Sequence, residues 1–175
     1  MNELLTEAVV LDHRESGEFD KIIFLYTQEL GKVAAKAVSA RKITSKLAGH
    51  LEPLNIVKAR LIQKNGGFKI VDAIALRKIK RSFEALALAS FIKEMTFELA
   101  GDRKFWLAIK KSFRELEKKE RASYAPLLKI LGFDPKFAGC ETCGGKHVTH
   151  FVKNETVFLC RHCAFKAPKN ELILL

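Results

Sequence analysis

The sequence lacks any long apolar run, and this absence limits where the protein can act. Lys, Arg, Asp or Glu interrupts every apolar stretch before it approaches the roughly 20 residues that a membrane-spanning helix needs. The first residues include Glu3 and Glu7, where a secretory signal would have a basic start followed by an apolar stretch. We therefore expect a cytoplasmic protein without a membrane partner.

Motifs of catalysis are also missing. The sequence contains no glycine-rich phosphate loop, no Gly-x-Ser-x-Gly elbow and no paired carboxylates in an apolar setting. His50-Leu51-Glu52 with a later Cys-x-x-Cys resembles part of the zinc nucleobase deaminase signature. That match is poor, because Gly139 and not proline precedes Cys140, and because a second Cys-x-x-Cys would have no role. We expect no catalytic residues, no small-molecule substrate and no enzyme turnover.

Acidic residues are scarce relative to basic ones. The 175 residues include 31 Lys and Arg against 20 Asp and Glu, a formal net charge of +11, which predicts a polyanionic partner such as nucleic acid. No acid lies between Glu29 and Glu52, so this stretch should carry uncompensated positive charge, although an ordinary solvated strand face is the alternative. The predicted DNA-binding residues are Lys32, Lys36, Arg41, Lys42, Lys46, Arg77, Lys78, Lys80, Arg81, Lys110, Lys111 and Arg114.

Residues 1–80 are predicted to form a small barrel. Short runs rich in Val, Ile and Phe alternate with turn signals, the strongest of which is Asn65-Gly66-Gly67. Closure into a barrel of the OB or SH3 type would remove the exposed strand edges of a lone sheet. The expected strands are Thr6–Leu11, Lys21–Thr27, Lys32–Ser39, Leu54–Gln63 and Phe68–Ile74.

Two features of the predicted barrel bear on binding. Lys32 and Lys36 share a strand face, whereas Val33, Ala35 and Ala37 point to the other side. Aromatic rings could add stacking on unpaired bases, although core or rim packing is the favoured interpretation for each candidate ring. The candidate rings are Phe19, Tyr26 and Phe68.

Residues 81–138 are predicted to form a helical domain. Apolar residues recur at steps of three and four over Phe83–Leu99 and again over Phe105–Leu116, where basic residues are interleaved. Ser123 is expected to cap a third helix that ends at Gly132. The second helix should therefore present a basic face.

The four cysteines form two Cys-x-x-Cys units separated by sixteen residues, Cys140/Cys143 and Cys160/Cys163. In a reducing compartment this spacing favours a structural Zn²⁺ ion in a closed four-thiolate shell. Reduced structural thiols and a redox pair are the alternatives. We predict a zinc-binding segment over residues 139–165, with a small hairpin between the two units, and a tail of residues 166–175 that packs on the helical domain.

Several stretches give the chain a resemblance to the RecO family of bacterial recombination mediators. They are AVVL at 8–11 with EFDKI at 18–22, ARK at 40–42 leading through SKLAGHLEP at 45–53, and LLKILGFDP at 127–135 leading to Cys140-x-x-Cys143-Gly144. The resemblance implies an α+β protein: an N-terminal five-stranded OB-fold barrel, then a small α-helical domain that carries the zinc-ribbon-like segment.

The resemblance also implies a function in DNA repair and homologous recombination. Such a protein binds single- and double-stranded DNA, anneals complementary strands and, together with RecR, helps RecA replace single-strand-binding protein at the bacterial nucleoid. Family members usually continue with further helices after the last cysteine pair, so we expect reduced surfaces for RecR and single-strand-binding protein here. The alternatives from the residues are a zinc-ribbon and OB-fold RNA-binding accessory protein of translation or ribosomes, and a metalloenzyme with an open zinc position.

Overall fold

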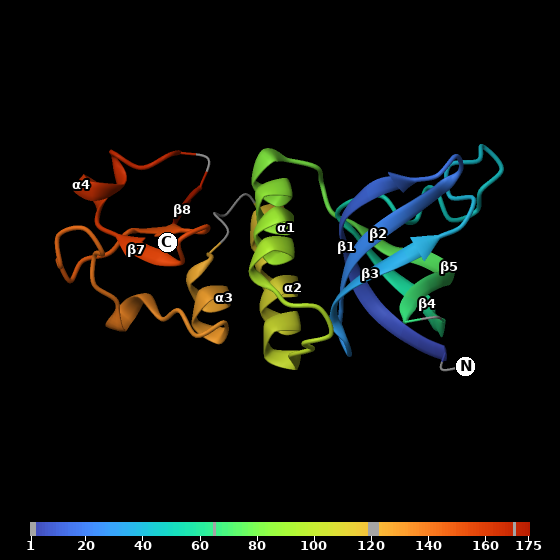
Figure 1. The fold of residues 1–175 in the computed structure, drawn as a ribbon, viewed down its shortest axis with the longest axis horizontal. Helices are drawn as coiled ribbons and strands as arrows, with labels where there is room; N and C mark the ends of the chain where they lie inside the picture. The colour runs from blue at the N-terminus through green and yellow to red at the C-terminus, as the bar shows by residue number, and fades with distance from the viewer. Residues whose placement is uncertain (1–2, 65, 119–122, 170) are drawn as a thin grey trace.

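The computed structural model describes residues 3–64, 66–118, 123–169 and 171–175 (Figure 1). Its N-terminal part is a closed barrel with the strand order β1-β2-β3-β5-β4, in which β1 pairs with both β2 and β4. The pairing of β3 with β5 is parallel and the other pairings are antiparallel, an arrangement of the OB type. The strands are β1 (Glu3–Ser16), β2 (Asp20–Thr27), β3 (Gly31–Ala37), β4 (Asn55–Lys64) and β5 (Gly67–Lys78).

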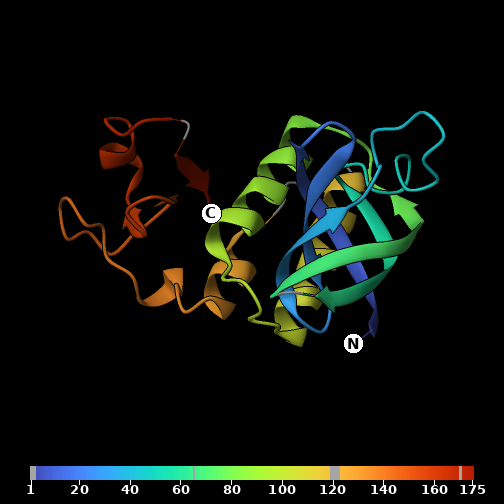
Figure 2. The ribbon, with the colours of Figure 1, turned by 45° about the vertical axis from the view of Figure 1, so that its right-hand side comes forward.

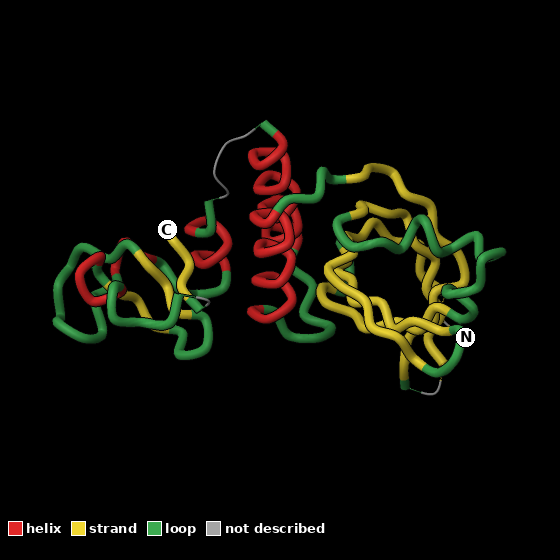
Figure 3. The backbone as a smooth tube through the Cα atoms, turned by 90° about the horizontal axis from the view of Figure 1, so that it is seen from above, coloured by secondary structure: helices red, strands yellow, loops and turns green. Residues whose placement is uncertain are grey.

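Strand β1 is buried on both faces. Ala8 and Val10 point into the barrel interior, whereas Val9 and Leu11 point outward into a second apolar cluster that the helices share. A bulge between Val10 and Asp12 bends the strand, so that its first half pairs with β4 and its second half pairs with β2. This bend lets β1 continue to Ser16, beyond the predicted end at Leu11. Figure 3 shows the closed ring of strands from above.

The other predicted strands lie close to their observed positions. Strand β5 continues to Lys78 rather than ending at Ile74, because it pairs with β4 over the whole length of that strand. Residues 64 and 67 face each other across the predicted hairpin turn, of which Asn65 lies outside the described residues. Val33, Ala35 and Ala37 are buried inside the barrel while Lys32 and Lys36 point outward, as the parity of the strand predicted.

Two helices, α1 (Phe83–Met95) and α2 (Arg103–Glu117), cover one outer face of the barrel. A third helix, α3 (Ala125–Ile130), packs on α2 on the side away from the barrel (Figure 1). Ser82 and Asp102 cap the first two, since their side chains accept hydrogen bonds from the backbone N–H groups of Ala85 and Phe105. Figures 1 and 2 show the first two helices standing between the barrel and the C-terminal segment.

The first helix ends at Met95, so the prediction that it continues to Leu99 is wrong. Leu99 has a positive φ of 57°, and its N–H donates to the carbonyl of Lys32 at 3.0 Å. The loop after α1 therefore lies beside β3, where Lys32 also forms an isolated bridge with Glu98. A tertiary contact with the barrel overrides the helical periodicity of this segment.

The cap of the third helix also differs from the prediction. Tyr124, and not Ser123, is the N-cap residue, and its side chain makes no capping hydrogen bond. Pro126 lies in the first turn, where a missing N–H costs nothing. The helix ends as predicted, because Gly132 has a φ of 94° and the N–H of Phe133 donates to the carbonyl of Leu128 at 2.8 Å.

The C-terminal part is a small sheet with the order β7-β6-β8. Its elements are η1 (Pro135–Phe137), β6 (His150–Val152), β7 (Val157–Leu159), α4 (Arg161–Ala164) and β8 (Leu172–Leu174). Phe151 and Ile173 join the same apolar cluster as residues of α1 and β1. One cluster thus contains residues from the barrel, the helices and the C-terminal sheet, and the division of the chain at residues 80, 138 and 165 stays a prediction. None of the helices in the described residues is long and apolar enough to cross a membrane.

Candidate metal centre and nucleic-acid interface

The four cysteines meet at one point in space. Their Sγ atoms all lie within 4.8 Å of one another, and those of Cys143 and Cys160 are 3.8 Å apart. A tetrahedral zinc ion with Zn–S bonds of about 2.3 Å places its sulfur ligands roughly 3.8 Å from each other. The spacing of the thiols therefore fits a four-coordinate metal ion.

Two tight turns aim these sulfurs. In the first, the N–H of Gly144 donates to the carbonyl of Cys140 and the N–H of Cys140 donates to the carbonyl of Gly145, both at 2.8 Å. Gly144 has a φ of 70°, which a residue without a Cβ adopts without strain. In the second, Cys160 is the N-cap of α4, and its Sγ accepts a hydrogen bond from the N–H of Cys163 at 3.5 Å.

Hydrogen bonds and burial move the pKa values of two of these thiols in opposite directions. A hydrogen bond from the backbone of Cys160, with others from Cys143 and Thr142, lowers the pKa of Cys140 to about 6. Burial, followed by hydrogen bonds with the other three thiols, raises the pKa of Cys163 to about 12. Four thiolates this close repel one another, so all four ionise together only around a positive ion. The donor set fits a thiolate-binding metal.

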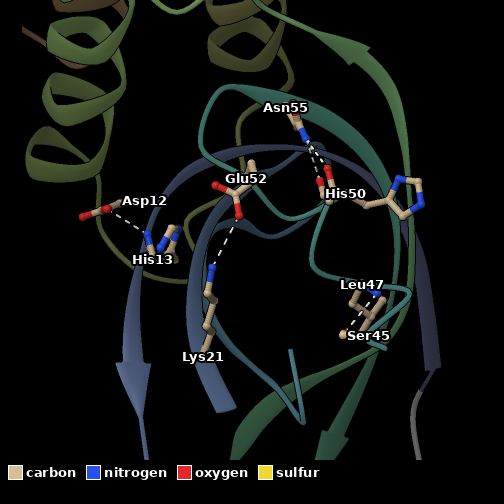
Figure 4. A network of polar contacts seen from close by, with 9 residues as sticks. Asp12, His13, Lys21, Ser45, Leu47, His50, Glu52 and Asn55 are labelled. Carbon is tan, nitrogen blue, oxygen red and sulfur yellow. Dashed lines mark hydrogen bonds and ion pairs between the residues drawn. The ribbon is translucent and has the colours of Figure 1, made fainter. Parts of the chain in front are cut away.

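His50-Leu51-Glu52 has a structural role at the barrel. His50 Nδ1 accepts a hydrogen bond from the N–H of Ala75 at 3.1 Å, and Leu51 is buried in the barrel interior. Glu52 pairs with Lys21 at 3.4 Å (Figure 4). Among the described residues, the group that could hold a metal contains only the four cysteines. The deaminase-like motif and the Cys-x-x-Cys units therefore do not form one site.

The segment between β3 and β4, residues 38–54, is called the barrel loop here. Asn55 is buried, and its amide donates to the carbonyls of Gly49 and His50 at 3.2 and 3.0 Å (Figure 4). At the other end of the loop, the N–H of Ser39 donates to Asp20 Oδ1 at 2.8 Å. The N–H of Arg41 donates to the carbonyl of Phe19 at 2.9 Å. The barrel loop is thus tied to the β1–β2 turn.

Several predicted DNA-binding residues already have partners. Lys32 donates to the carbonyl of Lys93 in α1 at 2.9 Å, so the helices hold it. The expectation that residues 30–51 lack compensating acids is wrong in three dimensions, since Asp20 pairs with Lys36 at 2.9 Å and Glu15 pairs with Arg41 at 3.1 Å. The remaining partnered cations are Arg77 with Glu117, Lys110 with Glu7 at 2.9 Å and Lys111 with Glu115 at 3.7 Å.

Other predicted cations are exposed and form no ion pair with any residue that the structure describes. Pairing of Asn55 with Lys78, together with a hydrogen bond from the N–H of Ile79 to the carbonyl of Leu54, brings the end of β5 next to the barrel loop. Arg114 lies one turn before Glu117, the partner of Arg77. The exposed cations without an ion pair are Lys42, Lys46, Lys78, Lys80, Arg81 and Arg114.

Sequence reasoning treated the aromatic residues alike, but the structure separates them. Tyr26 is fully buried and stacks on Trp106, and Phe68 packs against the barrel interior. Phe19, at the β1–β2 turn, is 41% exposed, and Lys42 Nζ lies 5.1 Å from the centre of its ring. Ile43, which follows Lys42 and which no sequence pattern marks, is fully exposed. Tertiary packing therefore buries Tyr26 and leaves Phe19 and Ile43 exposed.

Comparisons with known proteins agree with this fold. Residues 1–90 match the family described as Recombination protein O N terminal. Three similar relatives carry the name DNA repair protein RecO: one of Bacillus velezensis is 27% identical over 93% of this chain and 69% of its own length. One of Rubrobacter xylanophilus is 28% identical over 93% of this chain and 72% of its own length. One of a Thermoanaerobacter species is 26% identical over 99% of this chain and 78% of its own length. The likeness therefore extends beyond the barrel.

Proposed function

Because the chain belongs to the RecO family of DNA repair proteins, we propose that it acts as a recombination mediator on DNA. In this proposal it binds single- and double-stranded DNA, anneals complementary strands, and assists RecA loading together with RecR on strands coated by single-strand-binding protein. Its place of action is the bacterial cytoplasm at the nucleoid. No covalent step belongs to this function.

The observation that carries the proposal is a set of exposed cations on one loop and one strand end of an OB-type barrel, none of which forms an ion pair with a described residue. The barrel loop contributes Lys42 and Lys46, and the strand end beside it leads into Lys78, Lys80 and Arg81. A protein with a net charge of +11 attracts polyanions. Exposed cations that form no ion pair with a carboxylate can bind phosphates without first breaking such a pair. Neutralising phosphates on two strands lowers their repulsion, which lets complementary bases meet.

We further propose that the metal is Zn²⁺ and that its role is structural. Four thiolates fill a tetrahedral shell, which leaves no open position for substrate or water. When bound, the ion would offset half of the negative charge of the four thiolates and link the two turns. Cys140 is buried among Val152, Leu159 and Ala164, so the sulfur cluster adjoins a small apolar core. Metal binding would therefore be coupled to folding of residues 139–165.

The experiment is DNA binding by the whole protein over a range of salt concentrations. If the five cations named above each neutralise one phosphate, the slope of log affinity against log salt for single strands is about −3.5. Lys42→Ala with Lys46→Ala should weaken binding and flatten the slope by about 1.4. Lys146→Ala with Lys166→Ala, which removes two exposed lysines near the cysteines, is the matched control and should leave the slope unchanged. Equal slopes in both double variants would remove the barrel loop from the interface.

A second measurement separates the mediator role from DNA binding alone. Complementary strands with one dye on each are annealed bare and after coating with single-strand-binding protein. Acceleration on coated strands supports the mediator role, whereas acceleration on bare strands alone reduces the proposal to annealing. If neither anneals faster and structured RNA outcompetes single-stranded DNA at fixed salt, an RNA-binding function replaces the proposal.

A further inference from the structure

We infer that the β1–β2 turn and the barrel loop form a base-contacting surface that prefers single-stranded DNA to duplex. This inference rests on the proposed DNA-binding function and names the form of DNA that one part of the interface takes. The surface consists of three exposed apolar side chains, Phe19, Val38 and Ile43, together with Lys42; it is called the apolar tip below.

The barrel strands themselves offer little for bases. OB folds often bind oligonucleotides on the face of strands β2 and β3 and on the loops beside that face, the β1–β2 loop among them. Here the helices cover that face, because Tyr26 of β2 is fully buried against Phe105 and Trp106 of α2. Lys32 of β3 is held by the carbonyl of Lys93. Contacts with bases therefore fall to the loops of the barrel, of which Figure 2 shows the barrel loop away from the helices.

The apolar tip has an exposure that packing does not explain. Phe19 is 41% exposed, Val38 is 41% exposed and Ile43 is fully exposed, all within segments whose backbone is fixed by hydrogen bonds. Exposed apolar side chains in a fixed and cationic setting are typical of a binding surface. The positive charge of Lys42 beside them favours a polyanionic partner. In single-stranded nucleic acid, the π-faces of the unpaired bases are the apolar surface that such a partner offers.

Phe19 and Lys42 are placed to contact one nucleotide together. Lys42 Nζ lies over the ring of Phe19 at 5.1 Å from its centre, so the ammonium group is held beside the aromatic platform. A base that stacks on the exposed part of the ring brings its own phosphate within reach of the cation. In a duplex the bases are already stacked and paired, so they offer no free face to Phe19.

Two acids position this pair. Asp20 accepts the N–H of Ser39 and pairs with Lys36, and the hydrogen bond from Ser39 is the main reason that the pKa of Asp20 lies below its ordinary value. Glu15 pairs with Arg41, whose N–H donates to the carbonyl of Phe19. The acids therefore hold the barrel loop against the β1–β2 turn, which limits the ordering that binding would require.

The test compares Phe19→Ala with Phe165→Ala in the full-length chain, because Phe165 is also exposed but lies after the last cysteine. Binding to a labelled oligothymidine and to a duplex of equal length is measured across salt concentrations. Phe19→Ala should weaken single-strand binding about tenfold, with duplex binding within about twofold and the salt slope unchanged, since stacking carries no charge. Phe165→Ala should match the wild type in all three.

Phe19→Trp gives a direct reading of the contact. Its added indole fluorescence should be quenched by oligothymidine and not by duplex, while the buried Trp106 provides a constant background. Equal losses on single strand and duplex in Phe19→Ala, or no loss on either, would overturn the inference while leaving DNA binding intact. A wild-type protein that binds neither DNA would overturn both this inference and the proposed function. Thermal unfolding of each variant separates a lost contact from a lost fold.

Discussion

Single residues decide how the loop after α1 meets the barrel. Gly31, at the turn between β2 and β3, has a φ of 70°, and an added Cβ would lie 2.4 Å from the carbonyl oxygen of Ala100. Gly101 is equally confined, since its Cβ would lie 2.3 Å from the carbonyl oxygen of Glu29. The two backbones touch directly, so no side chain fits between them. Glycine at these positions allows the helices to dock on the barrel.

Gly31→Ala is therefore expected to destabilise the protein by about 2–4 kcal/mol, because left-handed strain adds to a clash with backbone. Gly17→Ala is the matched control: Gly17 has a φ of 65°, but nothing lies within 4 Å of its added Cβ. It should cost only about 1 kcal/mol, the strain alone. Urea unfolding of both variants measures the difference. Equal losses would show that the close approach of the two loops contributes nothing.

At the scale of elements, the cysteine segment has little regular structure to hold it. Its strands β6, β7 and β8 span three residues each, and α4 spans four. Isolated elements this short are not stable in water. The turns at Cys140 and Cys160 fix where the sulfurs lie, and a metal ion would join them into one unit.

Cys140→Ser should accordingly lower the zinc content and the stability of the protein together. Metal content by elemental analysis and thermal unfolding are read on the same preparation. His162→Ala is the control, since His162 is exposed, neighbours Cys163 and is absent from the cluster of four thiols. It should keep its zinc and its unfolding temperature. A wild-type protein that stays fully stable after complete removal of the metal would contradict the coupling.

At the scale of the whole molecule, α1 connects the barrel to the cysteine segment through ion pairs. Lys93 pairs with Asp12 of β1 at 2.6 Å, and Glu94, the next residue, pairs with Lys153 after β6 at 2.7 Å. Burial raises the pKa of both carboxyl groups. The hydrogen bond from Lys93 to Asp12, and those from Lys153 and Ser90 to Glu94, outweigh burial, so that each pKa lies below its ordinary value. Both carboxylates thus stabilise the folded chain as anions.

This predicts how stability depends on pH. A carboxyl whose pKa is lowered by folding contributes fully above its unfolded pKa, here 3.8 for Asp12 and 4.5 for Glu94, and the contribution is lost as the pH falls through the folded value. Asp12→Asn with Glu94→Gln should lower the free energy of unfolding at pH 7 by about 0.2–1 kcal/mol per ion pair. Between about pH 5 and 3 the double variant should lose less stability than the wild type does. Chemical unfolding at each pH measures this.

The control for the pH dependence is Glu155→Gln, which neutralises an exposed carboxylate in the turn between β6 and β7. This variant should follow the wild type from pH 7 to pH 3. A double variant whose profile stays parallel to that of the wild type would show that the two ion pairs across α1 do not respond to acid.

Much of the molecule follows from local sequence. The alternation in β3 placed Val33, Ala35 and Ala37 inside the barrel, and the spacing of the cysteines predicted that their sulfurs would meet. Both signals are local, because strand parity and tight turns depend on neighbouring residues. The stretches that resemble the RecO family added the fold class and the order of its parts, which the closed barrel and the family match confirm.

The tertiary structure decided which charges and rings remain available. Asp20 pairs with Lys36, and Glu15 pairs with Arg41, only because the β1–β2 turn lies beside the barrel loop. The partners are too far apart in the sequence for a local pattern to predict these pairs. Leu99 fits a helical period but instead lies beside β3. Phe19 and Tyr26 are equivalent candidates in the sequence, yet the helices bury Tyr26 and leave Phe19 exposed. Such outcomes depend on contacts between distant segments, whose energies local patterns do not encode.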